Sequence, residues 1–389
     1  EYLVAVFLDF EKAYDMLWTQ GLLYKLDGLG IRGNMFGFLR SFLLNRTFEV
    51  RLHQTVSRVC TVSNGTPQGS VISPTLFNVM VNDLHTVLSR CALSQFADDS
   101  SIWSCFRDIM AAKNAIEADL EHILQWCHSW GFKLSGTKTV AMIFTRRRIP
   151  PGFQISMGRI PLTIVTHAKL LGLTFDTRLT WTVHIAALVT RCKKILQLLK
   201  SLSGIDWGGR PRQMLQLYRS LVRSRLDYGC QVYASASPSV LNQLNTIQAT
   251  GLRICLGVPR TTSTEALQVE AGELPLDLRR EQLTAQFYIR SFALPEDHPL
   301  TAESSISWLF FARQAFCTTL KKNPFIVRAH TTFDSLPFGT LNVESTSPVS
   351  FPPWHLDPPE VGLDLQSSCH KNNPPVKSKA IADEYIARN

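Results

Sequence analysis

The sequence lacks any apolar run that reaches the roughly eighteen residues of a membrane-spanning helix. Its first residues, Glu-Tyr-Leu-Val-Ala-Val-Phe-Leu, contain none of the basic side chains that begin a secretory signal. These two absences predict an intracellular protein with no membrane partner. The chain also lacks an initiator methionine and opens directly on an apolar run, so we expect a fragment whose upstream part is missing.

Closely spaced cysteine pairs are also lacking. None of the nine cysteines belongs to a C-x-x-C pair, and most lie within apolar patterns. Reduced, buried thiols in an intracellular protein are the interpretation we favour. Cys369 and His370 are adjacent and could share a metal ion, but no further ligands follow at the spacing of a zinc site, so a structural role is favoured for both.

Acidic residues are scarce in the middle of the chain. The 389 residues carry a net charge of +9 and are 45% hydrophobic, which is enough apolar material for two or three domains. Residues 146–260 hold seventeen Lys or Arg against three Asp or Glu, whereas residues 1–145 hold twelve against thirteen. A basic segment beside a near-neutral region indicates a polyanionic partner, although a solvated basic face would give the same pattern.

The apolar periodicity of the first 145 residues alternates between strand and helix. Residues 3–8 are continuously apolar, as in a strand buried on both faces. In order, the expected elements are a strand at 3–8, two helical patterns, a hairpin that begins at 48–52, a helix from Ser73-Pro74, two strands around 98–99, a helix over 109–127 ended by Gly131, and a strand at 139–144.

This order of elements predicts an α+β architecture. Strand, helix, strand, strand, helix, strand is the split βαβ unit, here with an insertion after its first strand. We therefore expect an antiparallel sheet with helices on one face, in which the first strand and the hairpin at 98–99 are central neighbours. Ser73 is expected to be the N-cap of its helix, with Pro74 in the first turn.

The remainder of the chain changes character twice. Residues 153–175 predict short strands with a turn at Gly158-Arg159, and residues 183–257 predict helices. Residues 337–375 contain eight prolines, which indicates a linker or a poorly ordered segment.

Three carboxylates are expected to meet in the predicted sheet. Asp9 ends the first strand, and Asp98 and Asp99 occupy the hairpin tip beside it. Packed together they would repel one another, and a divalent cation removes that repulsion. Oxygen-rich sites with few protein ligands suit Mg²⁺, and two such ions can serve phosphoryl transfer. An Asp-Asp pair at a turn is common, however, and each of these residues taken alone could be a solvated turn or strand end.

A glycine-containing segment, residues 64–70 (Asn-Gly-Thr-Pro-Gln-Gly-Ser), precedes the helix that starts at Ser73. Glycine permits close approach of the backbone to a ligand, and Gln68 could contact a base pair or a phosphate. An ordinary loop between a hairpin and a helix would also have this composition.

Five motifs follow one another along the chain: Phe-Leu-Asp-Phe-Glu-Lys-Ala-Tyr-Asp at 7–15, Gly-Thr-Pro-Gln-Gly-Ser at 65–70, Phe-Ala-Asp-Asp at 96–99, Gly-Phe-Lys-Leu-Ser-Gly-Thr-Lys-Thr at 131–139, and Lys-Leu-Leu-Gly-Leu-Thr-Phe-Asp at 169–176. In this order they resemble the palm motifs of reverse transcriptases, and in particular those of non-LTR (LINE-type) retrotransposons of the jockey-like group in arthropods. Two later patches, at 226–229 (Leu-Asp-Tyr-Gly) and 272–276 (Gly-Glu-Leu-Pro-Leu), resemble the segment that follows the palm in the same elements.

The resemblance implies an RNA-directed DNA polymerase that uses two Mg²⁺ ions, with Mn²⁺ as a substitute, and that binds an RNA template, a DNA primer or target DNA, and dNTPs. It implies that Asp9, Asp98 and Asp99 are catalytic metal ligands, with the backbone carbonyl of Phe10 as an added ligand. It also implies a nuclear site of action. A viral RNA-dependent RNA polymerase is a weaker alternative, because Tyr14 and the Phe-Ala-Asp-Asp form argue against it.

Nucleotide and primer contacts are implied for five further residues. Tyr14 would lie under the incoming sugar and exclude a 2′-hydroxyl, although a core aromatic is the alternative. Gln68 and Gly69 would border the nucleotide and the template. Lys138 would act near the pyrophosphate, although Ser135-Gly136 replaces the Asn that is common in relatives and an ordinary surface lysine is as plausible. Leu171 and Gly172 would lie in the hairpin that holds the primer end.

The resemblance also divides the chain into domains. It implies a right-hand polymerase palm at 1–150 with truncated fingers, a primer-grip hairpin region at 151–182, a helical thumb or connection at 183–290, and a Pro-rich linker or poorly ordered tail at 291–389. The thumb candidates for phosphate contacts share a positive charge: Arg146, Arg147, Arg148, Arg191, Lys193, Lys194, Lys200, Arg210, Arg212, Arg219, Arg223 and Arg225. An inactive transposon remnant that at most binds nucleic acid is the alternative to an active enzyme.

Overall fold

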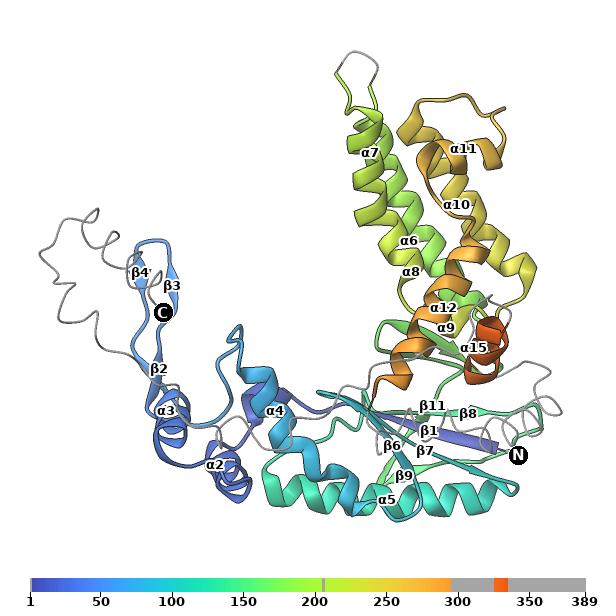
Figure 1. Cartoon of the computed structure of the whole chain (residues 1–389). Helices are drawn as coiled ribbons and strands as arrows, with labels where there is room; N and C mark the ends of the chain where they lie inside the picture. Colours follow the sequence, from blue (N-terminus) through green and yellow to red (C-terminus); the bar gives the residue numbers. More distant parts are fainter. Residues whose placement is uncertain (1, 205–206, 295–324, 335–389) are drawn as a thin grey trace, which may run out of the picture. The chain divides into compact units, whose positions relative to one another are not determined.

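The central element is a five-stranded sheet in the strand order β11-β8-β1-β7-β6 (Figure 1). The computed structural model describes residues 2–204, 207–294 and 325–334. As the split unit requires, β1 lies between β7 and β8. The strands are β1 (Tyr2–Leu8), β6 (Ala92–Phe96), β7 (Asp99–Phe106), β8 (Val140–Phe144) and β11 (Thr163–Ile164).

The sheet is mixed, so the expectation of an antiparallel sheet is wrong at one edge. β1, β6, β7 and β8 pair antiparallel, but β11 pairs in parallel with β8. A parallel pair needs a crossover connection of about a dozen residues or more, and residues 145–162 supply one.

One face of the sheet carries the core. Val4, Val6 and Leu8 alternate along β1 and are buried in one cluster with α5 (Ile109–Trp130), which packs against β1 and β7. Leu3 and Phe7 face the other way and are half-buried, so the expected burial of β1 on both faces is wrong at these positions. The predicted stop of α5 is confirmed, because Gly131 adopts a left-handed conformation at its C-terminus.

The insertion between β1 and β6 supplies helices and two small hairpin layers. Strand β2 pairs with β5, and β3 pairs with β4. The elements are α1 (Ala13–Met16), α2 (Thr19–Gly28), α3 (Gly33–Leu43), β2 (Arg46–Phe48), β3 (Arg51–Leu52), β4 (Thr55–Val56), β5 (Cys60–Val62), α4 (Ser73–Val81) and the 3₁₀ helix η1 (Asn82–Val87).

The start of α4 differs from the predicted cap. Ser73 is already helical, and the residue before the helix is Ile72, which offers no capping side chain. The hydroxyl of Ser73 instead donates to the carbonyl of Pro67 at 2.7 Å, so it ties the preceding loop to the helix. Pro74 lies in the first turn, as expected.

Two hairpins and a helical cluster follow the sheet. Gly158-Arg159 forms the predicted turn between β9 and β10, and a second turn joins β12 to β13. The elements are β9 (Ser156–Met157), β10 (Ile160–Pro161), β12 (His167–Leu170), β13 (Leu173–Asp176), α6 (Thr182–Ser201), α7 (Pro211–Tyr218), the π-helical turn η2 (Arg219–Arg223), α8 (Ser224–Asp227), α9 (Cys230–Tyr233), α10 (Pro238–Leu256), α11 (Thr264–Ala271), α12 (Leu276–Phe292) and α15 (Phe325–Asp334).

Two separate hydrophobic clusters divide the described chain. Residues 2–164, here the sheet region, share one cluster, and residues 167–294 with 325–334, here the helical region, contain the other. Within the helical region α12 packs against α15. Across the described ranges, no helix is both long and apolar enough to cross a membrane. The proline-rich segment at 337–375 and the Cys369-His370 pair lie outside the described residues.

Candidate polymerase site

Asp9 directly follows β1 and is held from its backbone. Its amide donates to Thr139 Oγ1 at 3.3 Å, and its carbonyl accepts from the Ser135 amide at 2.8 Å. Oδ2 of its carboxylate is buried and accepts no hydrogen bond among the described residues. Lys138 Nζ lies 3.7 Å from this oxygen, and its side chain is 71% exposed. The segment 135–139 therefore positions Asp9 and places the ammonium of one exposed lysine beside it.

Phe10 combines a buried ring with a carbonyl that the neighbouring backbone ladder does not use. Its side chain is buried and meets Phe132 edge-on, with ring centroids 5.7 Å apart. The short ladder around the Phe10–Leu134 bridge uses the Asp9 carbonyl and the Glu11 amide, which bonds Lys133. The carbonyl of Phe10 is thus left out of that ladder.

Asp98 and Asp99 occupy the hairpin that joins β6 to β7. Ala97 begins the turn with φ +53°, Asp99 starts β7 opposite Phe96, and both carboxylates are exposed. The β1–β7 register ends with Leu8 opposite Ser100, which brings the chain at Asp9 alongside Asp99. No three or more His, Cys, Asp or Glu side chains in the described ranges are gathered so that they could hold a metal ion. The predicted adjacency in the backbone is present, and the three-carboxylate metal site stays a prediction.

Tyr14 packs against the hydrophobic core of the sheet region. It is half-buried on α1 and stacks on Phe77 of α4, with ring centroids 4.6 Å apart. Burial, and next the negative charge of Asp98, raise the pKa of its hydroxyl. The Tyr14 ring is therefore supported on one face by Phe77, and its hydroxyl is close enough to Asp98 to interact with the negative charge of that carboxylate.

The segment 64–70 packs against α1. Gly65 has φ +82°, and a Cβ there would lie 2.9 Å from the backbone of Tyr14 and Asp15, so this position requires glycine. Gln68 donates from Nε2 to Asp15 Oδ1 at 2.9 Å, a partner that the motif alone did not reveal. Gly69 has φ +88° and no atom within 4 Å of an added Cβ, so its surface is open to a ligand.

Leu171 and Gly172 form the turn between β12 and β13. Their φ angles are +46° and +81°, and Leu171 is partly exposed. The Tyr228 hydroxyl donates to the carbonyl of Leu171 at 2.6 Å. The turn therefore belongs to the helical region, in which Leu173 of β13 is also buried.

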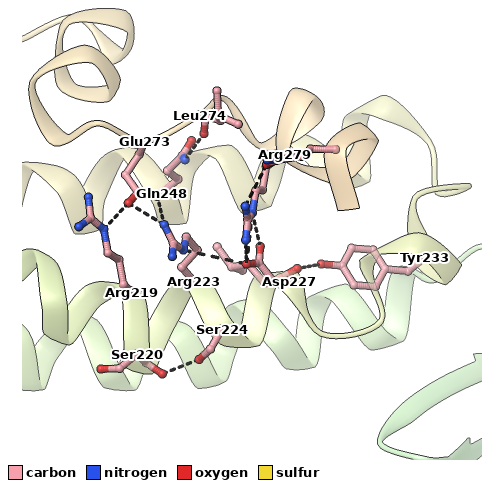
Figure 2. A network of polar contacts seen from close by, with 12 residues as sticks. Arg219, Ser220, Arg223, Ser224, Asp227, Tyr233, Gln248, Glu273, Leu274 and Arg279 are labelled. Atoms are coloured by element: carbon pink, nitrogen blue, oxygen red, sulfur yellow. Dashed lines mark hydrogen bonds and ion pairs between the residues drawn. The ribbon is translucent and has the colours of Figure 1, made fainter. Parts of the chain in front are cut away.

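Two of the predicted phosphate contacts have other partners. Arg219 Nε lies 2.7 Å from Glu273 Oε1, and Arg223 Nη1 lies 2.9 and 3.0 Å from its two oxygens (Figure 2). Glu273 is buried, so its charge must be neutralised by these arginines. Both candidates are thus already paired with an acid, which composition cannot show because that acid lies 54 residues from Arg219 and 50 residues from Arg223.

Sequence reasoning missed Asp119, a buried acid on α5. Its carboxylate accepts from the amides of Ser89, Arg90 and Cys91 and from the Ser89 hydroxyl, at 2.8 to 3.0 Å. Burial by itself would raise the pKa of this carboxyl, but these donors lower it to about 2. Asp119 thereby anchors the loop that leads into β6 and its Asp98-Asp99 turn. Its signal was a lone acid at an interior position of the predicted amphipathic helix.

Comparison with known proteins finds a reverse transcriptase family model and relatives named as RNA-directed DNA polymerases. A family model described as reverse transcriptase (RNA-dependent DNA polymerase) matches residues 1–175. The RNA-directed DNA polymerase from mobile element jockey of Drosophila melanogaster is 32% identical over 276 residues, which are 67% of this chain and 29% of that protein. The probable RNA-directed DNA polymerase from transposon X-element of the same species is 30% identical over 266 residues, 66% of this chain and 28% of that protein.

The chain therefore spans less than a third of the length of these two relatives. Among solved structures, telomerase from Candida albicans in complex with a fragment of telomeric RNA matches with a TM-score of 0.38 and 14% identity, over 70% of this chain and 51% of that chain.

Proposed function

Because the chain belongs to the reverse transcriptase family of non-LTR retrotransposons, we propose that it extends a DNA primer with dNTPs by copying element RNA. The observation that carries the proposal is the β1–β7 register, which brings Asp9 alongside Asp99. A nuclear site of action and a nicked target DNA as primer belong to the same proposal.

We propose that Asp9, Asp98 and Asp99 hold two divalent ions, Mg²⁺ or Mn²⁺, with the Phe10 carbonyl as an added ligand. The donor set fits such ions, because it consists of oxygens and includes Oδ2 of Asp9, which accepts no hydrogen bond among the described residues, and the carbonyl of Phe10, which the local ladder does not use. When bound, the ions would lower the pKa of the primer 3′-hydroxyl and offset charge on the leaving pyrophosphate.

The residues around the carboxylates receive complementary roles in the proposal. Tyr14, braced on Phe77, would lie under the sugar and exclude a 2′-hydroxyl. Gly69 would let the backbone approach the nucleotide, with Gln68 fixed beside it by Asp15. Lys138 would leave Asp9 for the pyrophosphate, which its exposed side chain allows.

The proposed domains keep the bounds that the resemblance implies, and they coincide only in part with the two hydrophobic clusters. Residues 1–150 would be the palm, and 151–182 would carry the primer grip at Leu171-Gly172. Residues 183–290 would be the thumb and 291–389 the linker or tail. The boundary between the clusters, at residues 164–167, falls inside the proposed primer-grip segment and supports a change of domain there.

A pair of measurements tests the metal and polymerase roles separately. Mn²⁺ binding, followed by electron paramagnetic resonance, should weaken in Asp98→Ala and Asp99→Ala. Incorporation of dNTPs on an RNA template with a DNA primer should be lost in the same variants. Retention of both signals in both variants would contradict the metal assignment. Metal and nucleic-acid binding without incorporation in the unaltered chain would favour the binding remnant instead.

A further inference from the structure

Two short motifs of the helical region, at 226–229 and 272–276, meet in the fold although 46 residues separate Asp227 from Glu273 (Figure 2). Arg223 stands between them, because its Nη1 bonds Glu273 and its Nε lies 4.0 Å from Asp227 Oδ2. Arg279 closes the group from α12, with Nη2 2.8 Å from the same Asp227 oxygen. The two motifs are thus parts of one ion network.

The network fixes the end of α8 in place. The Glu273 side chain is 2% exposed, and breaking a charge pair around such a group is strongly unfavourable. Arg219 and Arg223 reach it from the π-helical turn η2, and Arg279 reaches Asp227 from α12. The backbone that follows Asp227 therefore starts from a rigid point.

Tyr228 is the next residue, and it points away from the network to the β12–β13 turn. Its side chain is 58% exposed, yet its hydroxyl bonds the Leu171 carbonyl. A Cβ on Gly172 would lie 3.3 Å from the Tyr228 ring, and a Cβ on Gly229 would lie 2.7 Å from the Leu173 side chain. Two glycines with positive φ thus permit the close approach of the two segments.

The turn itself needs outside support. Leu171 is a branched residue with φ +46°, a backbone conformation that residues other than glycine seldom adopt. The hydroxyl of Tyr228 donates a hydrogen bond to the carbonyl of Leu171, which is part of the peptide bond between Leu171 and Gly172. We propose that Tyr228 is a positioning residue that fixes the Leu171-Gly172 turn against the ion network, in the orientation needed to hold the primer terminus. This inference rests on the proposed contact between that turn and the primer.

Hydrogen exchange of the turn tests the positioning contact without any need for catalysis. In Tyr228→Phe only the hydroxyl is lost, so exchange of amides in a peptide spanning 167–176 should quicken about three- to tenfold, the range for one net hydrogen bond. Exchange in α5 should stay the same. Tyr24→Phe is the matched control, because Tyr24 is exposed on α2. Unchanged exchange of 167–176 in Tyr228→Phe would overturn the proposal.

A primer-end probe tests the consequence. A DNA primer with 2-aminopurine at its 3′ end, annealed to RNA, should change fluorescence when the unaltered chain binds. Tyr228→Phe should lose about half or more of that change while duplex affinity shifts less than about twofold, because phosphate contacts supply most of the affinity. Equal fluorescence in both proteins would overturn the positioning role. No change with the unaltered chain would instead sink the primer-grip function, and hydrogen exchange would still decide the Tyr228 contact.

Discussion

The carboxylates of the sheet region and those of the helical region have opposite surroundings. Asp98 and Asp99 are exposed, and the Asp9 carboxylate has the Lys138 ammonium 3.7 Å away and accepts no hydrogen bond at Oδ2 within the described part of the chain. In the helical region Glu273 and Asp227 are enclosed by three arginines at hydrogen-bonding distance. The first set has negative charge left over, and the second has none.

This difference separates chemistry from architecture. A buried acid that arginines neutralise holds helices together, whereas acids with unmatched charge at a strand end are able to attract a cation. Charge compensation, rather than the number of acids, therefore marks the candidate site.

Removal of one unmatched carboxylate should abolish activity and leave the fold intact. Asp99→Asn keeps the side-chain shape and removes the charge, so dNTP incorporation should fall by roughly 100- to 1,000-fold or more, the scale for loss of an electrostatic group at a reaction centre. Melting temperature should stay the same, because Asp99 is exposed. Asp277→Asn, an exposed acid in the first turn of α12, is the control for primer extension. A large loss of stability in Asp99→Asn would break the contrast.

Removal of a carboxylate that arginines neutralise should instead lower the stability of the fold. Glu273→Gln leaves Arg219 and Arg223 without their shared anion, so unfolding free energy should fall by about 2 to 3 kcal/mol, less than for a fully buried pair because both arginines are partly exposed. Urea denaturation measures it. Glu270→Gln, exposed on α11, should be silent. Equal stability of the two variants would show that the network contributes nothing.

Local sequence patterns predicted most of the fold of the sheet region and the positions of its acids in the chain. They did not predict which side chains those acids contact. The continuous run at 3–8, the glycine stop at 131 and the hairpin at 98–99 are each set by neighbouring residues, and all three are present. The parallel edge strand and the half-buried outer face of β1 depend on what packs from elsewhere, and both were mispredicted.

Contacts between residues distant in the sequence also explain which site residues were misjudged. Positive charge in residues 146–260 was evident, and Arg219 and Arg223 were among the candidates for phosphate contacts, but their pairing with Glu273 was not evident because Glu273 lies far along the chain. Likewise, Gln68 was assigned to a nucleotide without knowledge of its bond to Asp15. Charge and spacing indicate what a side chain is able to bind, and only the tertiary structure shows whether another residue already binds it.

Acid should weaken a third kind of carboxylate, which backbone amides compensate. Folding lowers the pKa of Asp119 to about 2, below its unfolded value, so its stabilisation of about 2 kcal/mol is present above roughly pH 4 and is lost as pH falls through 2. The stability difference between the unaltered chain and Asp119→Asn should therefore shrink from pH 4 to pH 2 in urea titrations. A constant difference would contradict compensation by the amides.

The smallest effect is expected at the exposed hydrogen bond between Gln68 and Asp15. Gln68→Ala removes one exposed hydrogen bond to Asp15, so stability should change by no more than about 0.5 kcal/mol. If Gln68 borders the incoming nucleotide, the KM for dNTPs should rise about two- to fivefold while kcat stays within about twofold, because binding is weakened without loss of the reacting groups. Gln125→Ala, on the exposed side of α5, is the control. A fall in kcat alone would place Gln68 with the reacting groups, and no kinetic change would make its bond to Asp15 purely structural.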